Sequence, residues 1–304
     1  MPAASVRDRV ASHLVGRGRE LDLLLSAVAA GRDVLLEGPP GISKTTLLRA
    51  ITAEWGIPLL FVEGNADLTP AKLIGHHNPA RVLREDYSAE NFVDGPLVAA
   101  MRQGGFLYIE EFNRAPEDTL NALLTAMAER QVTVPRVGTV GAAASFRVIA
   151  SMNPYDNVGT TRLSTSVHDR LCRLAVGYQD ERDERGIVAL RTGATAAAAG
   201  SLDDRLIADA VAVTRATREH PDVRQGSSVR GAIDCVLVAR ELAGLRGVTG
   251  ADDQRYPELV LDAMTVALSG RIHLDEAAET TPERVLRELW EDLFVLRPAV
   301  AEPG

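Results

Sequence analysis

Apolar runs and helical patterns alternate through the first half of the chain. Short runs rich in valine, isoleucine and leucine stand at residues 34–36, 58–62, 105–109, 146–151 and 173–176. Between them, apolar residues recur at helical spacing over residues 43–55 and 118–129. Strands separated by helices in this way indicate a parallel sheet that is covered on both faces. We therefore predict an α/β domain over residues 1–178, built on a five-stranded parallel sheet.

Beyond Tyr178 the pattern is helical. Apolar residues recur at helical spacing over residues 206–217, 233–242 and 259–268, which predicts a small all-helical domain at residues 179–274. Residues 275–304 form a third segment, a helix and tail with eight acidic and three basic side chains, a charge of 3 − 8 = −5. This segment is either a solvated face or a docking or regulatory element.

Composition restricts the class of protein. Apolar residues make up 46% and charged residues 25%, and the net charge is 33 − 42 = −9, which is typical of a globular protein and argues against nucleic-acid binding by bulk charge. A run of about 18 apolar residues, as a membrane span requires, is absent, and the N-terminal stretch lacks the apolar region of a secretory signal. We expect a cytoplasmic protein whose Cys172 and Cys235 are reduced.

A loop with phosphate-binding character follows the first apolar run and opens a helix. Its residues are Gly38, Pro39, Pro40, Gly41, Ile42, Ser43, Lys44, Thr45 and Thr46. Backbone N–H groups at a helix N-terminus attract anions; Lys44 would reach the β- and γ-phosphates, and Thr45 would offer a hydroxyl to Mg²⁺. Ser43 stands where the usual pattern has glycine, and a left-handed backbone there would cost about 1 kcal/mol or more. The alternative is a plain strand–turn–helix connection.

Three polar residues follow the third and fourth apolar runs. Glu110 and Glu111 end the third run, and Asn153 follows the fourth. Ligands of open parallel sheets bind beyond the carboxyl ends of the strands; one carboxylate there can hold a metal through water and the other can deprotonate an attacking water. Glu110 replaces the more usual aspartate. The alternatives are two solvated acids and a turn-forming Asn-Pro pair.

The order of these motifs resembles the AAA+ ATPases. The segments that carry the resemblance are Gly38–Thr46, Glu110–Pro116, Ser151–Pro154 and Val167–Leu171. Further matching segments are residues 15–20, 67–75, 94–96, 129–134 and 226–232. The chain is most similar to the MoxR branch, close to the ATPase subunit of magnesium chelatase. The resemblance covers residues 14–270 and implies an AAA+ core followed by a helical lid. Residues 132–138 read as a hairpin, and the polar segment 81–91 as an insertion loop facing the ring pore or a partner.

The resemblance also implies residue roles. Lys44 and the loop would bind ATP, Thr45 and Glu110 would hold Mg²⁺, and Glu111 would be the catalytic base. Asn153 would be the first sensor. Arg170 would reach the γ-phosphate of a neighbouring subunit, and Arg230 would be the second sensor on the same chain. The alternative for each arginine is a surface ion pair, worth about 0–1 kcal/mol.

By this resemblance the protein is expected to be a ring-forming ATPase, a hexamer, that remodels a partner protein such as one with a von Willebrand factor A domain. Magnesium-chelatase-like and gas-vesicle-type subunits are closer alternatives. A regulatory switch that binds ATP and hydrolyses it slowly is another, because Ser43 and Glu110 depart from the common pattern.

Overall fold

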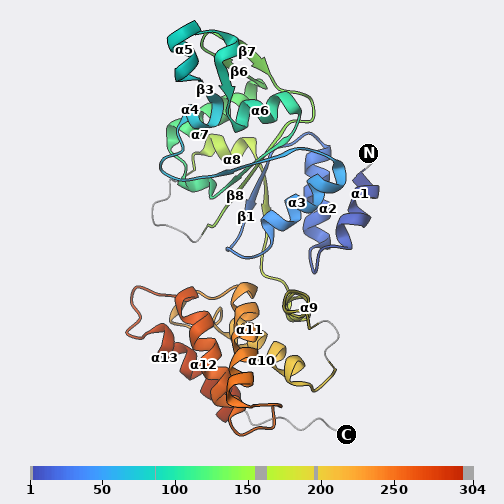
Figure 1. Ribbon diagram of the computed structural model, residues 1–304, viewed down its shortest axis with the longest axis vertical. Helices are drawn as coiled ribbons and strands as arrows, with labels where there is room; N and C mark the ends of the chain where they lie inside the picture. Colours follow the sequence, from blue (N-terminus) through green and yellow to red (C-terminus); the bar gives the residue numbers. More distant parts are fainter. Residues whose placement is uncertain (1–2, 86, 155–162, 195–197, 297–304) are drawn as a thin grey trace. The chain divides into compact units, whose positions relative to one another are not determined.

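The computed structural model describes residues 3–85, 87–154, 163–194 and 198–296 (Figure 1). The chain divides into two compact units, which we call the α/β unit (residues 1–177) and the helical unit (residues 178–304). Among the described residues, every helix is too short or too polar to cross a bilayer.

A five-stranded parallel sheet forms the centre of the α/β unit. Its strands are β1 (Val34–Glu37), β2 (Leu59–Glu63), β5 (Phe106–Glu110), β8 (Arg147–Met152) and β9 (Cys172–Ala175). They lie in the order β2-β5-β8-β1-β9, and every neighbouring pair is parallel. The predicted α/β class and the five predicted strands are thus confirmed. Because β8 lies between β1 and β5, the residues that follow these three strands are neighbours at one edge.

Helices cover both faces of this sheet. Helix α3 (Lys44–Trp55) covers one face, where the ring of Trp55 lies 6.4 Å from that of Phe106. On the other face, α6 (Pro96–Gln103) and α7 (Glu117–Glu129) pack in one core with Leu107 and Ile109. Successive side chains of a strand point to opposite faces; even-numbered residues of β5 therefore face α3.

The remaining helices of the α/β unit flank this core. They are α1 (Ala3–Ala11), α2 (Gly18–Ala29), α4 (Pro70–Ile74) and α8 (Thr165–Arg170). Helix α1 packs on α2 and α3, and α2 contacts β1 and β9. Buried Asp33, at the start of β1, accepts the Val148 N–H at 2.7 Å and pairs with Arg130 at 3.0 Å. These bonds fix β1 against β8 at the amino edge of the sheet, and burial raises the pKa of the Asp33 carboxyl.

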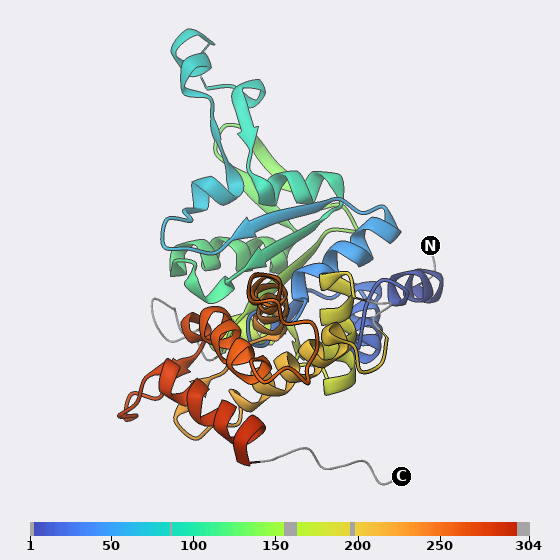
Figure 2. The same cartoon turned by 60° about the horizontal axis from the view of Figure 1, so that its bottom comes forward.

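Two hairpins extend from the α/β unit. The hairpin of β6 (Gln131–Val134) and β7 (Gly138–Gly141) confirms the prediction for residues 132–138. The second hairpin, β3 (Gly75–His77) with β4 (Phe92–Asp94), projects away from the sheet (Figure 2). Its tip contains α5 (Pro79–Glu85) and the short helix η1 (Ala89–Asn91), so the loop expected over residues 81–91 is in part helical.

Over its described residues, the helical unit has five α-helices and a two-stranded sheet as its framework. The helices are α9 (Glu181–Thr192), α10 (Leu202–Ala216), α11 (Val229–Arg246), α12 (Tyr256–Leu268) and α13 (Pro282–Glu291), and the strands are β10 (Val223–Gln225) and β11 (His273–Leu274). All five helices contribute buried residues to one core.

The acidic C-terminal helix is part of that core. Val285 and Leu286 of α13 are fully buried, and the Trp290 indole donates a hydrogen bond to the carbonyl of Pro257 at 2.7 Å. The side chains of Glu283 and Arg287 lie on its exposed face. The helix is therefore amphipathic, with one face packed and the other solvated.

Truncating the packed face should destabilise the helical unit. Leu286→Ala removes fully buried methyl groups and leaves a cavity, so we expect the free energy of unfolding to fall by about 2–5 kcal/mol. Arg287→Ala, on the exposed face of the same helix, should change it by less than about 0.5 kcal/mol. Urea unfolding followed by circular dichroism measures both. Equal stability of Leu286→Ala and wild type would show that α13 contributes nothing to the core.

Candidate active site

The predicted phosphate loop connects β1 to α3 at the carboxyl edge of the sheet. Gly38 lies so close to β9 that an added Cβ would stand 2.1 Å from the carbonyl oxygen of Val176, which excludes a side chain there. The Lys44 ammonium donates hydrogen bonds to the carbonyls of Gly38 at 2.6 Å and Pro39 at 3.1 Å. The amine is therefore folded back over the loop, beside the backbone N–H groups that begin α3.

Two residues of the loop have left-handed backbones. Gly41 has φ +78° and Ser43 has φ +69°. Ser43 therefore has the left-handed backbone that was predicted to cost stability. The cost arises because a Cβ in this region clashes with its own backbone. The loop keeps its conformation although the residue before Lys44 is not glycine.

A buried arginine anchors the loop to the end of β9. Arg17, 3% exposed, donates from one guanidinium nitrogen to the carbonyls of Ile42 at 3.0 Å and Gly177 at 2.8 Å. Its other terminal nitrogen pairs with Glu20 at 3.1 Å. The sequence analysis gave Arg17 no role of its own, and only its place in the resembling segment 15–20 pointed to it.

The hydroxyl of Thr45 contacts the end of β5. It donates a hydrogen bond to Glu110 Oε1 at 3.1 Å and lies 3.3 Å from the Tyr108 hydroxyl. The Tyr108 hydroxyl is in turn 3.0 Å from Ser151 Oγ. Burial, more than the nearby Glu110 carboxylate, raises the pKa of the Tyr108 phenol, so this group stays protonated. Neither Tyr108 nor Ser151 had a predicted role, although Ser151 begins the matching segment Ser151–Pro154, because a tyrosine and a serine within apolar strands look like core residues.

The pair of oxygen donors Thr45 and Glu110 fits Mg²⁺. This ion prefers hard oxygen ligands and is usually held by one or two side chains together with phosphate oxygens and waters. The described residues contain no group of three or more histidine, cysteine, aspartate or glutamate side chains that could hold a metal ion. An ion at this place would therefore depend on a bound phosphate.

Glu111 stands just beyond β5 with a left-handed backbone. Its φ is +52°, which turns the chain out of the strand. Gly64 permits this turn, because a Cβ there would lie 2.3 Å from the Glu111 carbonyl oxygen. The Glu111 side chain is 44% exposed, and its Oε2 pairs with Arg114 Nε at 3.0 Å. The Glu111 carboxylate is thus open to water, next to the partly buried Glu110 at the end of β5.

The other predicted site residues lie at three different places. Asn153 directly follows β8, between the loop after β1 and the two glutamates after β5. Arg170 is exposed at the C-terminal end of α8, where its guanidinium donates to the Ser166 carbonyl at 2.9 Å. Arg230 is exposed near the start of α11 in the helical unit.

Arg170 and the phosphate loop occupy opposite edges of the sheet. Cys172, two residues after Arg170, pairs with Val34 at the amino end of β1, whereas Gly38 follows its carboxyl end. Four residues of strand separate the two edges, about 13 Å at 3.3 Å per residue. The C-terminal end of α8 therefore lies about one strand length from the phosphate loop of its own chain.

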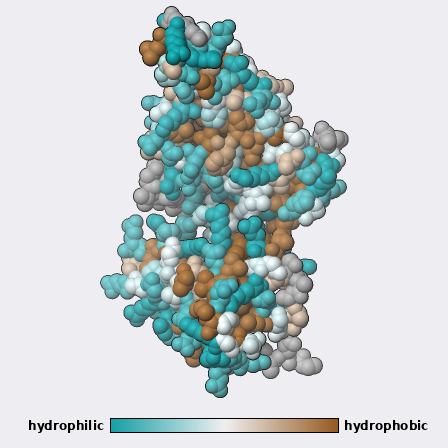
Figure 3. All heavy atoms as spheres, viewed as in Figure 1, coloured by the Kyte–Doolittle hydropathy of each residue, from teal (hydrophilic) through white to brown (hydrophobic). Residues whose placement is uncertain are grey.

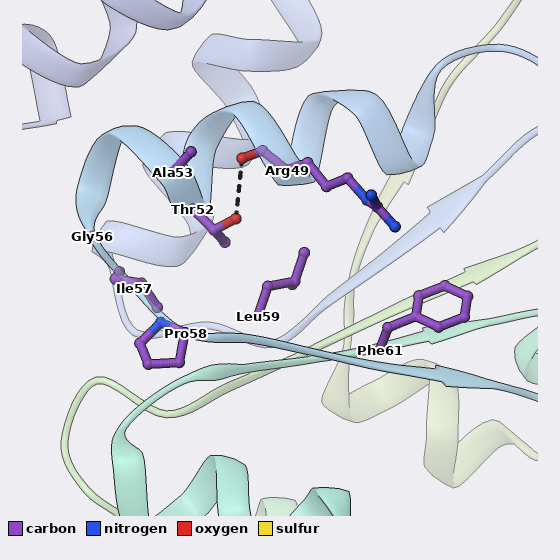
Figure 4. A pocket seen from close by; sticks show the side chains of 8 residues that line it. All are labelled: Arg49, Thr52, Ala53, Gly56, Ile57, Pro58, Leu59 and Phe61. Carbon is purple, nitrogen blue, oxygen red and sulfur yellow. Dashed lines mark hydrogen bonds between the residues drawn. The ribbon is translucent and has the colours of Figure 1, made fainter.

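A separate hollow lies between α3 and the edge strand β2 (Figure 4). Arg49, Thr52 and Ala53 of α3 line one side, and Leu59 and Phe61 of β2 line the other. Its lining combines apolar side chains with Arg49, and the Thr52 hydroxyl is already bonded to backbone carbonyls of its own helix. The polar groups suited to an anion gather at the carboxyl edge instead.

A parallel sheet with a lysine-bearing loop after β1 and acidic residues after β5 defines the P-loop class of nucleotide-binding folds. The AAA domain (dynein-related subfamily) matches residues 33–171. The chain is 28% identical to the gas vesicle ATPase GvpN of Ancylobacter aquaticus over 92% of its length and 79% of that protein. It is 29% identical to the chaperone MoxR1 of Mycobacterium tuberculosis (91% and 78%) and 30% identical to the Bacillus subtilis protein YeaC (80% and 80%).

Solved structures agree on the fold. A putative ATPase from Cytophaga hutchinsonii has a TM-score of 0.51 at 23% identity, covering 94% of this chain and 92% of its own. A variant of Thermotoga maritima RuvB has a TM-score of 0.53 at 18% identity, covering 83% and 71%. The chain belongs to the AAA+ ATPases, in their MoxR branch. The resemblance found in the sequence is thereby confirmed at the level of the branch.

Relieving the strain at Ser43 should stabilise the α/β unit. Ser43→Gly removes a left-handed Cβ worth about 1–2 kcal/mol, and the added freedom of glycine in the unfolded chain offsets about 0.5–1 kcal/mol. We therefore expect the free energy of unfolding to rise by about 0.5–1 kcal/mol in urea melts. Ser164→Gly, where φ is −68° and the side chain makes no capping bond, should bring no gain. A loss of stability in Ser43→Gly would mean that the serine side chain supports the loop.

Proposed function

We propose that this protein is a ring-forming ATPase that hydrolyses ATP with Mg²⁺ and uses the cycle to remodel or activate a partner protein. The observation that carries the proposal is the arrangement at the carboxyl edge of the sheet. The phosphate loop, the Thr45–Glu110 pair and the exposed Glu111 carboxylate stand together there.

Each residue has a proposed task in hydrolysis. Gly38 to Thr46, with the Lys44 ammonium, hold the phosphates of ATP. Thr45 and Glu110 would hold Mg²⁺, whose charge offsets that of the phosphates when it is bound. Glu111 orients a water and takes its proton, and the Asn153 amide positions that water near the γ-phosphate. Release of Glu111 from Arg114, 3.0 Å away, would precede this step.

The two arginines are proposed to act at different distances. Arg170 lies at the edge of the sheet opposite the loop, so its guanidinium would serve a neighbouring copy in a ring, as a hexamer allows. A planar guanidinium can meet two oxygens of a phosphoryl group that is being transferred. Arg230, on α11, would act as the second sensor on the same chain.

The projecting hairpin supports contact with another protein. Leu83 of α5 is 88% exposed, and Tyr87 and Val93 are about half exposed. Apolar side chains standing in water at the tip of a projection are typical of an interaction site. The family resemblance favours a partner protein with a von Willebrand factor A domain. The functions of a magnesium-chelatase-like subunit and of a gas-vesicle-type subunit remain alternatives within the same class of ATPase.

A second candidate function is a switch that binds ATP and hydrolyses it slowly. The Glu111–Arg114 pair favours it, because a carboxylate held by an arginine is not free to orient the attacking water. Steady-state hydrolysis measured against protein concentration, with mass by light scattering, decides between the two. Specific activity that rises as a ring forms supports the motor; tight binding without turnover at every assembly state supports the switch.

Changing the proposed base should separate binding from turnover. We expect Glu111→Gln to bind ATP as the wild type does and to hydrolyse it about 10²–10⁴-fold more slowly, the usual contribution of a general base. Lys44→Ala should lose nucleotide binding itself. Glu117→Gln, which changes an exposed acid on α7 of the same unit, should leave both unaffected. Turnover of Glu111→Gln at the wild-type rate would remove Glu111 from the base role.

Arg170 should be needed by the neighbouring copy only. We expect Arg170→Ala to hydrolyse ATP at least about 10³-fold more slowly, by analogy with the arginine fingers of small GTPases. Mixing it with Glu111→Gln should restore activity, because some interfaces then pair an intact Glu111 with an intact Arg170. Arg32→Ala, an exposed arginine just before β1, serves as the control. Absence of restoration in mixtures that form rings would assign Arg170 a structural role.

A further inference from the structure

Three hydroxyl groups and a carboxylate form a chain beneath the phosphate loop. Tyr108 on β5 is fully buried and Ser151 on β8 is 1% exposed. Ser151 Oγ lies 3.0 Å from the Tyr108 hydroxyl, which lies 3.3 Å from Thr45 Oγ1, and Thr45 donates to Glu110 at 3.1 Å. The chain thus joins β8, β5 and α3 and ends at the two residues assigned to the metal.

The proton count gives this chain a direction. A carboxylate only accepts hydrogen bonds, and each hydroxyl has one proton to donate. Thr45 uses its proton toward Glu110, so Tyr108 is the donor in its contact with Thr45, and Ser151 is the donor toward Tyr108. The Thr45 oxygen is thereby held from two sides, with a lone pair left for a cation.

Packing alone does not account for a tyrosine at this position. Its ring lies 5.7 Å from that of Phe61 in a tilted aromatic pair, and a phenylalanine would fill the same space. A buried hydroxyl lowers stability unless it is hydrogen-bonded. The hydroxyl of Tyr108 is bonded toward Ser151 and Thr45, that is, into the candidate metal site.

We propose that Tyr108 is a positioning residue that, supported by Ser151, fixes the Thr45 hydroxyl and so sets the affinity of the site for Mg²⁺. Tyr108 acts through the two residues assigned to the metal: its hydroxyl contacts Thr45 and also interacts with the Glu110 carboxylate. The inference rests on the proposed function, because it assigns the metal to Thr45 and Glu110.

Mg²⁺ titrations of nucleotide binding test this role without relying on turnover. In the Glu111→Gln background, a fluorescent ATP analogue is titrated at rising Mg²⁺ concentration and, separately, in EDTA. We expect Tyr108→Phe to raise the half-saturating Mg²⁺ concentration about fivefold, the loss of about one hydrogen bond. Affinity for the analogue in EDTA should stay within about twofold of the parent.

Ser151→Ala provides an independent variant. It should shift the Mg²⁺ dependence in the same direction but less, because it acts through Tyr108. The double variant should equal Tyr108→Phe for the same reason. Tyr256→Phe is the matched control. The Tyr256 hydroxyl also donates a hydrogen bond to a carboxylate, that of Asp209 at 2.8 Å in the helical unit. Its removal should leave the Mg²⁺ dependence unchanged.

The outcomes separate the two proposals. A parent protein that binds no analogue, with or without Mg²⁺, overturns the proposed function itself. The second outcome is a parent that binds the analogue with Mg²⁺ and a Tyr108→Phe variant that has the same Mg²⁺ dependence but lower thermal stability. This result overturns the positioning role and leaves Tyr108 a packing residue. Should Tyr108→Phe not fold, the shift or its absence in Ser151→Ala decides the question.

Discussion

The hydrogen bond between Thr45 and Glu110 is the contact on which the arrangement of the site depends. It joins the first turn of α3 to the last residue of β5, and the two bonded residues are 65 positions apart in the sequence. Without it, the loop and the acidic strand end would be two solvated polar segments at the same edge. With it, an oxygen pair suited to Mg²⁺ lies beside the Lys44 ammonium, in a unit whose centre is otherwise apolar.

Strain in the backbone accompanies this arrangement at two points. Ser43 and Glu111 both have left-handed backbones, although neither is glycine. Ser43 stands two residues before Thr45, where the chain enters α3, and Glu111 directly follows Glu110, where the chain leaves β5. Strained residues of this kind persist only where the surrounding structure fixes them, and here Arg17 and the close approach of Gly64 do so.

The two edges of the sheet divide the proposed chemistry between copies of the chain. The carboxyl edge holds the loop, Glu110, Glu111 and Asn153, and the amino edge holds the end of α8 with Arg170. A parallel sheet keeps these ends about one strand length apart, whatever the side chains do. In the proposed function, Arg170 at the amino edge would therefore act on the nucleotide of a second copy.

Local sequence signals were enough to predict the five strands, their parallel arrangement and the polar residues at their carboxyl ends, because apolar runs, helical spacing and loop chemistry all act over short stretches of chain. It also identified the MoxR branch through Gly38–Thr46 and the segment from Glu110 to Pro116. Its reading of residues 81–91 as a loop was in part wrong, because the exposed Leu83 and its neighbours form α5, where the hairpin of β3 and β4 holds the ends of the segment together.

Only the tertiary structure decided the contacts between distant segments. Tyr108 and Ser151 read as core residues in two apolar strands until β5 and β8 pair and bring their hydroxyls 3.0 Å apart beneath Thr45. Arg17 likewise acquires a role when Ile42 and Gly177 meet beside it. The acidic tail proved to contain a core helix, α13, because Val285 and Leu286 find partners on α10 to α12. Such contacts depend on which elements become neighbours, and local sequence patterns do not contain that information.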